Sequence, residues 1–306
     1  MRLNGRSNAT KRAVKTRHVL IICRVLSYLP LMALTLQQKS NNSNFPKPAE
    51  LIEIRETAAL EASDRVLINT LYRLAHDSGD LAKPEARWSI PMADLNIGKH
   101  ESNDRMRESL KRLLGVQVTV TYQAPDMGEE KVLQTVLFTH FSSPLSGPGN
   151  LDYGIPDELR AILVRSGRWG RIKAEIVHAM SSKYAIALYE LVKLRANLKY
   201  CSETIPIDRF RALLGVPPGA YENGTDFLRR VINPAVLEVN GLSELNCSVK
   251  FVRDHTRAPI TAVLLGWWEK NIDQNRAAIQ ELNRSKLGRK ARLTGKAETI
   301  SQEVAL

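Results

Sequence analysis

Apolar side chains recur along the chain with two kinds of spacing. Over 64–79 and 102–115 they lie three or four residues apart, which is the period of a helix with one buried face. Over 116–122 and 131–141 they alternate with polar residues, which is typical of half-buried strands. The pattern therefore predicts two helices followed by two strands. The inward residues expected for the second of these helices are Met106, Leu110, Leu113 and Leu114.

The same order returns in the second half of the chain. Helical spacing covers 181–195, 207–215 and 225–241, and alternation covers 245–251 before a last apolar strand that ends at Trp267 and Trp268. A short helix introduced by an Ile-Pro pair precedes the third helix of each copy; the pairs are Ile90-Pro91 and Ile205-Pro206. Three helices followed by a two-stranded ribbon is the winged-helix plan. The sequence predicts an α+β protein with two tandem winged-helix domains.

Four segments follow from this division. We expect an N-terminal tail over 1–47, a first winged-helix domain over 48–172, a second over 173–270 and a C-terminal tail over 271–306. The polar lead-in at 37–48 has little to bury, and 142–154 is expected to be a loop. The link between the copies keeps its own apolar periodicity, which indicates packed modules rather than separate beads. Pro234 is expected to kink the third helix of the second copy, and the C-terminal tail is expected to be helical to about Leu287.

Net charge is +12, which invites a nucleic-acid interpretation. Residues 1–31 contain seven basic residues and no acid, and 270–306 contain eight basic and four acidic residues. The 238 residues between them carry 29 basic and 28 acidic residues. Bulk charge therefore does not indicate that the folded body binds DNA, and local clusters must carry that argument.

The apolar run at 19–36 follows a basic stretch and has the outline of a signal peptide or membrane anchor. Arg24 and Pro30 interrupt it, and no small-residue cleavage site follows. Our hypothesis is that residues 1–31 are an over-extended start and that the native chain begins at Met32. The alternative is a protein tethered to a membrane through 17–36, which cell fractionation would distinguish. We expect no membrane association and a cytoplasmic protein.

Motifs of common enzymes are missing from the sequence. There is no GxxxxGK[ST] phosphate loop, and the six histidines form no HxH or HExxH pattern, which argues against an ATPase and against a metal-dependent nicking enzyme. The cysteines Cys23, Cys201 and Cys247 make no CxxC pair and are expected to be reduced thiols. We therefore expect no catalytic residues, no metal and no cofactor.

Base reading is expected at the front of the third helix of the second copy. Arg229, Arg230 and Asn233 lie on its outward face, and Arg and Asn suit guanine and adenine edges in the major groove. The alternative is an ordinary solvated surface in which an arginine pairs with Asp226 or Glu238. Phosphate contacts are expected from the second wing through Lys250, Arg253 and Arg257.

The equivalent helix of the first copy has mixed charge. Its basic residues Arg105, Arg107, Lys111 and Arg112 are interspersed with Asp104 and Glu108. We expect phosphate contact here rather than base reading. Intrahelical pairs of Glu108 with Lys111 or Arg112 are an equally good explanation.

Several stretches together resemble the iteron-binding initiator replication proteins of theta-replicating plasmids. They are SSKYAIALYELVKLRAN, IPIDRFRALLGVPPGAY, DFLRRVINPAVLEVNGLSEL and AVLLGWW in the second copy, and ELIEIRETAAL and SNDRMRESLKRLLGVQVTV in the first. The resemblance covers roughly 49–268.

The resemblance implies binding to direct repeats, called iterons, in double-stranded origin DNA. Members start replication as monomers, repress their own gene as dimers, and recruit the host initiator and the replicative helicase. By this resemblance Arg229, Arg230 and Asn233 read bases, and the first module supplies backbone contacts and the dimer surface. The rival interpretation is a winged-helix transcriptional regulator without an initiator role.

Overall fold

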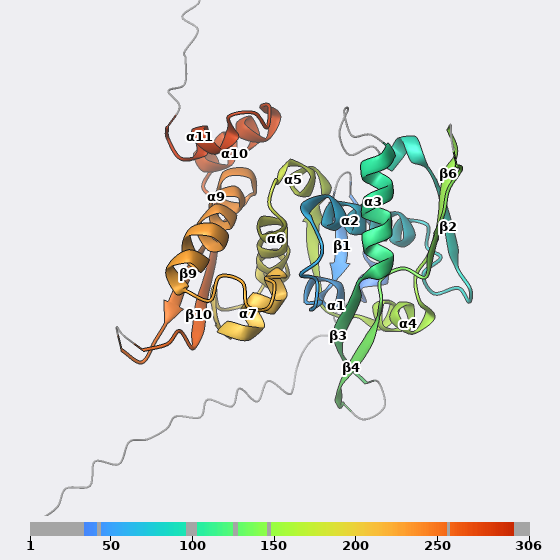
Figure 1. The fold of residues 1–306 in the computed structure, drawn as a ribbon, viewed down its shortest axis with the longest axis horizontal. Helices are drawn as coiled ribbons and strands as arrows, with labels where there is room; N and C mark the ends of the chain where they lie inside the picture. Colours follow the sequence, from blue (N-terminus) through green and yellow to red (C-terminus); the bar gives the residue numbers. More distant parts are fainter. Residues whose placement is uncertain are drawn as a thin grey trace, which may run out of the picture. The chain divides into compact units, whose positions relative to one another are not determined.

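The computed structural model describes residues 34–41, 44–95, 103–124, 128–145, 148–255 and 258–296. Within the first copy the predicted order is present and extra elements surround it (Figure 1). The elements shared with the winged-helix plan are α2 (Ala62–Asp77), the 3-10 turn η2 (Met92–Leu95), α3 (Asn103–Gly115), β3 (Gln117–Gln123) and β4 (Glu130–Val136). The additions are η1 (Thr35–Gln37), β1 (Asn44–Pro48), α1 (Ala49–Ile52), β2 (Arg87–Pro91), β5 (His140–Ser142), β6 (Asn150–Gly154) and α4 (Asp157–Arg165).

The second copy follows two short elements, β7 (Trp169–Lys173) and α5 (Ala174–Ala179). Its winged-helix elements are α6 (Lys183–Arg195), β8 (Ser202–Pro206), α7 (Ile207–Leu214), α8 (Gly224–Phe227), the π-helical turn η3 (Leu228–Ile232), α9 (Asn233–Leu242), β9 (Leu245–Val252) and β10 (Ala262–Glu269). Two further helices follow, α10 (Ile272–Asn283) and α11 (Arg289–Leu293). The α+β class and the two winged-helix modules are confirmed.

All strand pairs described are antiparallel. The second module has a three-stranded sheet in the order β8-β10-β9, and the first has the ribbon β3-β4 and a separate sheet in the order β2-β6-β5. In β9 the side chains of Leu245 and Cys247 are buried and Lys250 is exposed, as the alternation predicts. Trp267 is 2 % exposed and Trp268 47 %, so one tryptophan lies in the core and the other at the surface.

Four expectations about local structure are wrong. The lead-in at 37–48 contains β1, which pairs with β7 in the register Asn44↔Lys173 and buries Phe45 completely. The segment 142–154 is not a loop throughout, because β6 joins β5 to β2. Leu114 is 39 % exposed, since it is at the edge of the buried face of α3. By sequence the caps expected for α2 are Ser63 or Asp64, but its N-cap is Glu61, and Asp64 accepts a hydrogen bond from the backbone amide of Glu61 at 2.8 Å.

Helix α6 joins the two modules. Its residues are buried on all sides, which is characteristic of a helix inside a core rather than on its surface. It contacts α9 and α7 of the second module and α1, α2 and β7 on its other side (Figure 1). Gly170 of β7 allows this close approach, because a Cβ there would be 2.9 Å from the backbone nitrogen of Leu194. The expectation of packed modules is confirmed.

The C-terminal segment is folded beyond the expected limit. Helices α10 and α11 both contact α9, and Arg289 is buried. At Pro234, where a kink is expected, the π turn η3 directly precedes α9. The hypothesis about residues 1–31 lies outside the described residues.

Candidate nucleic-acid interface

The helix expected to read bases runs through three consecutive elements, α8, η3 and α9. Its start is capped by Asn223, whose side chain accepts a hydrogen bond from the backbone amide of Thr225 at 2.8 Å. At its other end Lys270 donates to the carbonyls of Asn240 at 2.5 Å and Ser243 at 2.6 Å. These contacts satisfy carbonyls that a helix end leaves without partners. We call residues 224–242 the recognition helix.

A π turn sets the phase of this helix. Phe227, Val231, Ala235 and Val239 are all buried and recur every four residues, whereas an α-helix has 3.6 residues per turn. Within the turn the amide of Asn233 donates to the carbonyl of Leu228, an i to i−5 bond. The wider turn keeps all four side chains on one face. It also accommodates Pro234, which has no amide hydrogen to donate.

The outward face carries the residues predicted to read bases. Arg229 is 68 % exposed and Arg230 59 %, and Asn233 is exposed. Both arginines face the same carboxylate, since Asp226 is 2.8 Å from Arg229 and 3.6 Å from Arg230. Exposed ion pairs of this kind are worth about 1 kcal/mol or less. The pairing therefore orders the two guanidinium groups, and it is weak enough for them to leave Asp226 and bind DNA.

Arg211 lines the groove at the start of the recognition helix and was not predicted. It donates to the carbonyl of Tyr221 at 3.1 Å and to that of Ala220. Its guanidinium also lies 4.7 Å from the centre of the Phe227 ring. Arg211 thus ties α7 to the loop that delivers the recognition helix. Its position just before the turn-rich GVPPGAYENG stretch is a signal that could have suggested this role.

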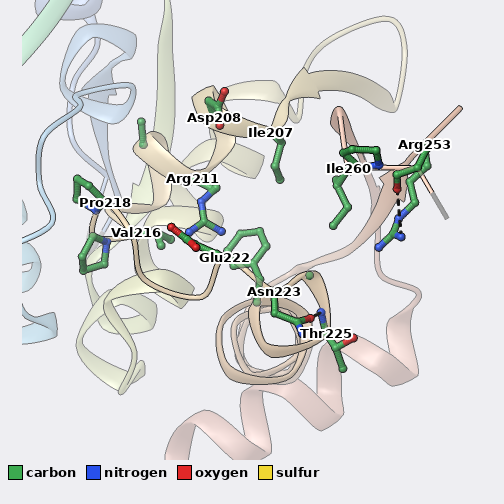
Figure 2. A pocket seen from close by; sticks show the side chains of 17 residues that line it. Ile207, Asp208, Arg211, Val216, Pro218, Glu222, Asn223, Thr225, Arg253 and Ile260 are labelled. Atoms are coloured by element: carbon green, nitrogen blue, oxygen red, sulfur yellow. Dashed lines mark hydrogen bonds between the residues drawn. The ribbon is translucent and has the colours of Figure 1, made fainter.

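The wing approaches the start of the recognition helix. Arg253 donates to the carbonyl of Ala258 at 3.4 Å, and its guanidinium lies beside Gly224, where a Cβ would be 3.3 Å from Nη2. Between the wing and the helix is an open groove of about 870 Å³. Figure 2 shows Arg253 and Ile260 on one side of it and Asn223 and Thr225 on the other. Lys250 is exposed on β9, while Arg257 lies outside the described residues.

The basic residues of α3 are placed differently from one another. Arg105 and Lys111 are exposed. Arg107 donates to the carbonyls of Pro144 at 3.0 Å and Leu145 at 2.8 Å. The side chain of Arg112 is neither left outward for a phosphate nor paired with Glu108.

Arg112 is held by a carboxylate of the first module. It makes two hydrogen bonds to Asp64, at 2.8 and 2.9 Å, and Asp64 is fully buried. The hydrogen bond to Asp64 raises the pKa of Arg112. The geometry thus favours a structural role for Arg112 and leaves Arg105 and Lys111 as the outward cations of this helix.

The described residues give no sign of a metal site or of a membrane-spanning helix. Within the described ranges, no group of three or more His, Cys, Asp or Glu side chains could hold a metal ion. None of the helices seen there has the length and apolar character needed to cross a bilayer. Burial raises the pKa of the Cys247 thiol to about 12, which keeps it protonated and unreactive. The surface that stands out chemically is the one around the recognition helix.

A winged-helix module with a capped helix, outward arginines and an adjoining wing defines a class of duplex-DNA-binding proteins. Comparison with known proteins makes the assignment more specific. Residues 47–193 match the family model described as initiator replication protein, WH1, and residues 206–265 match initiator Rep protein, WH2. The chain belongs to the family of initiator replication proteins.

A solved structure supports the same fold. The chain is similar to the Pi initiator protein, crystallised in complex with iteron DNA, with a TM-score of 0.56 and 15 % sequence identity. The match covers 76 % of this chain and all of that one. No curated protein matches the sequence.

Proposed function

We propose that the protein initiates plasmid replication by binding iterons in double-stranded origin DNA, without being an enzyme. The observation that carries this proposal is the exposed Arg229, Arg230 and Asn233 face of a capped recognition helix in an initiator-family chain. The solved initiator of similar fold was crystallised with iteron DNA, which supports the choice of ligand. Further parts of the proposal are recruitment of the host initiator and helicase, repression of its own gene, and a cytoplasmic location.

The two modules divide the work in this proposal. Residues 173–270 read bases through the recognition helix, and Lys250, Arg253 and Arg257 contact the sugar-phosphate backbone. Residues 48–172 contribute phosphate contacts through Arg105 and Lys111 and supply the dimer surface. A monomer–dimer equilibrium would then separate initiation from repression. Arg107 and Arg112 are omitted from the proposed contacts, because backbone carbonyls hold the first and Asp64 holds the second.

The direct test uses the DNA that flanks the gene, searched for direct repeats and titrated with the protein in a footprinting assay. Arg229→Ala or Arg230→Ala should cost about 1–3 kcal/mol on the repeat, because each removes a fork that can pair with guanine. Arg276→Ala is the control, since Arg276 is 73 % exposed and lies two positions before the buried Ala278, nearly on the opposite side of α10. Unchanged affinity and specificity for both arginine variants would contradict the assignment of the reading face.

Asp226→Asn tests the role of the carboxylate that Arg229 and Arg230 share. Without the carboxylate the two guanidinium groups lose their shared partner and face any phosphate more freely. We expect affinity for random-sequence duplex to rise several-fold and the ratio of specific to non-specific binding to fall. A variant with weaker binding to all sequences would show that Asp226 itself contributes to the bound state.

A further inference from the structure

The C-terminal helices α10 and α11 lie beyond the segment that matches the family and are fastened to the recognition helix. Arg289 is buried and donates to the carbonyl of Ala179 at 2.7 Å and to that of Arg284 at 2.9 Å. Leu293 packs on Gly241, where any Cβ would collide with it. The absence of a side chain at Gly241 lets α11 approach the second half of the recognition helix closely.

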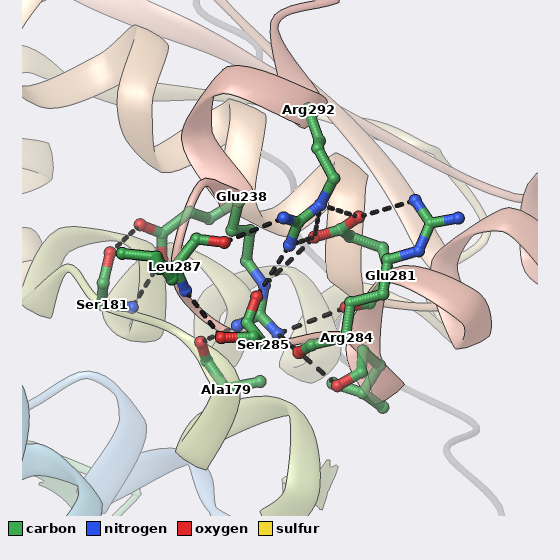
Figure 3. Close-up of polar contacts among 10 residues, drawn as sticks. Ala179, Ser181, Glu238, Glu281, Arg284, Ser285, Leu287 and Arg292 are labelled. Atoms are coloured by element: carbon green, nitrogen blue, oxygen red, sulfur yellow. Dashed lines mark hydrogen bonds and ion pairs between the residues drawn. The ribbon is translucent and has the colours of Figure 1, made fainter. Parts of the chain in front are cut away.

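One carboxylate organises this segment. Glu281 accepts from Arg292 at 2.8 Å and from Arg289 at 3.3 Å, and Arg284 lies 3.7 Å away. Figure 3 shows Arg284 and Arg292 converging on Glu281, with Arg292 also turned toward the carbonyls of Ser285 and Leu287. The fold of the segment therefore uses Arg289 and Arg292.

The segment is strongly basic. Residues 276–296 contain seven basic residues and a single acidic one, Glu281. Lys286, Lys290 and Lys296 are exposed, and Arg284 is 44 % exposed. The net charge of this stretch is thus +6, whereas the 238 residues before the C-terminal stretch are almost neutral.

The exposed lysines stand beside the recognition helix. A small apolar hollow of about 250 Å³ is lined by Pro234 and Leu237 of that helix and by Lys286, Lys290 and Leu293 of the C-terminal segment. Pro234 directly follows Asn233, and Leu237 is one turn further on. At 1.5 Å per residue, the lysines flank the helix within about two turns of its reading face. The wing flanks the opposite end, at Gly224.

We infer that Lys286 and Lys290 bind the phosphate backbone of the same duplex that the recognition helix reads. The inference rests on the proposed function, because it requires that helix to occupy a major groove. That groove is about 12 Å wide, so a helix lying in it has a phosphate strand along each side. The C-terminal segment and the wing then contact backbone at the two ends of one helix.

The test measures binding of the full chain to a cognate duplex and to a random-sequence duplex as salt is varied. Lys290→Gln should lower the slope of log K against log salt by about 0.9, and Lys286→Gln with Lys290→Gln by about 1.8, on both duplexes. The ratio of specific to non-specific binding should stay the same. Restoring charge with Lys290→Arg should restore the slope.

Arg276→Gln is the matched control for the single variant. Arg276 is 73 % exposed on α10, two positions before the buried Ala278 and so nearly on the opposite side of that helix. It should leave the slope unchanged. Failure of the wild-type chain to bind duplex DNA would overturn the proposed function. Wild-type binding with an unchanged slope in the double variant would overturn this inference alone. The lysines would then contact an acidic protein or form an ordinary solvated surface. Weaker binding at an unchanged slope would also overturn it, since that outcome indicates a structural effect.

Discussion

Arginine side chains do two different kinds of work in this protein, and their surroundings distinguish the two. Arg211 and Arg289 donate to backbone carbonyls and hold loops or helices in place. Arg229 and Arg230 are mostly exposed and share a single aspartate. Only the second kind can move onto a ligand without loosening the fold. The count of basic residues near a groove is therefore a poor guide to DNA contact unless their partners are known.

His178 makes stability dependent on pH. Burial, together with the nearby charges of Arg73 and Lys286, lowers its pKa to about 4. An unfolded histidine has a pKa near 6.5, so protonation below that value favours the unfolded chain. The contribution is present in full above pH 6.5 and is lost as the pH falls toward 4, by about 3 kcal/mol at most. Denaturant titrations at several pH values should show this acid loss, and His178→Gln should flatten it. An equally steep loss in the variant would assign it to other groups.

At the scale of elements, the π turn has two causes that can be separated. Pro234 cannot donate the bond that an α-helix needs there, and the buried residues Phe227, Val231, Ala235 and Val239 need a four-residue period. Since the apolar period remains in Pro234→Ala, the turn should persist. We expect iteron affinity within about threefold of the wild type, because a surviving turn leaves the reading face in place. A loss comparable to that expected for Arg230→Ala would indicate that the proline alone sets the phase.

Elements with a local period could be predicted, and those that depend on distant partners could not. The strand β9 and the buried face of the recognition helix follow from their spacing. Strand β1 could not be recognised, because NFPKP contains two prolines and its ladder partner is β7, more than a hundred residues away. Proline is tolerated there because each strand of a two-stranded sheet is an edge.

The candidate site could likewise be predicted only where the local period of the sequence determines it. The outward direction of Arg229, Arg230 and Asn233 follows from helical period alone. The bond between Arg112 and Asp64 joins residues 48 positions apart, whereas sequence spacing suggests only partners within one helical turn. The packing of the C-terminal segment and its last helix, α11, were missed for a related reason. The segment has few large apolar residues, and it is held by Arg289 and the contact with Gly241.

At the scale of the whole molecule, a buried ion pair joins the first module to α6. Lys47 Nζ lies 2.8 Å from Glu190 Oε1, with both side chains almost fully buried, and burial lowers the pKa of Lys47. Removing one partner of such a pair typically costs about 3–5 kcal/mol. Lys47→Met should therefore lower the free energy of unfolding by that amount in a denaturant titration.

Two further variants make this prediction specific. Lys47→Met combined with Glu190→Gln should recover most of the loss, because the amide stays neutral and can still accept from Asn69, 2.6 Å from Glu190. Lys83→Met, which removes an exposed pair with Asp80, should change stability by less than about 1 kcal/mol. Equal losses in the Lys47 and Lys83 variants would contradict a special role for the buried pair.

The position of α6 inside both cores has a consequence for recombining members of this family. A chimaera that exchanges reading modules by cutting at 174–180 separates β7 from the helix on which it rests. A junction in the exposed stretch 197–201, after α6, keeps the contact between β7 and α6. The face of α6 toward α7 and α9 then becomes the interface between the two parents. Compatible parents should therefore be chosen by the residues of α6 that face the incoming module, ahead of overall identity.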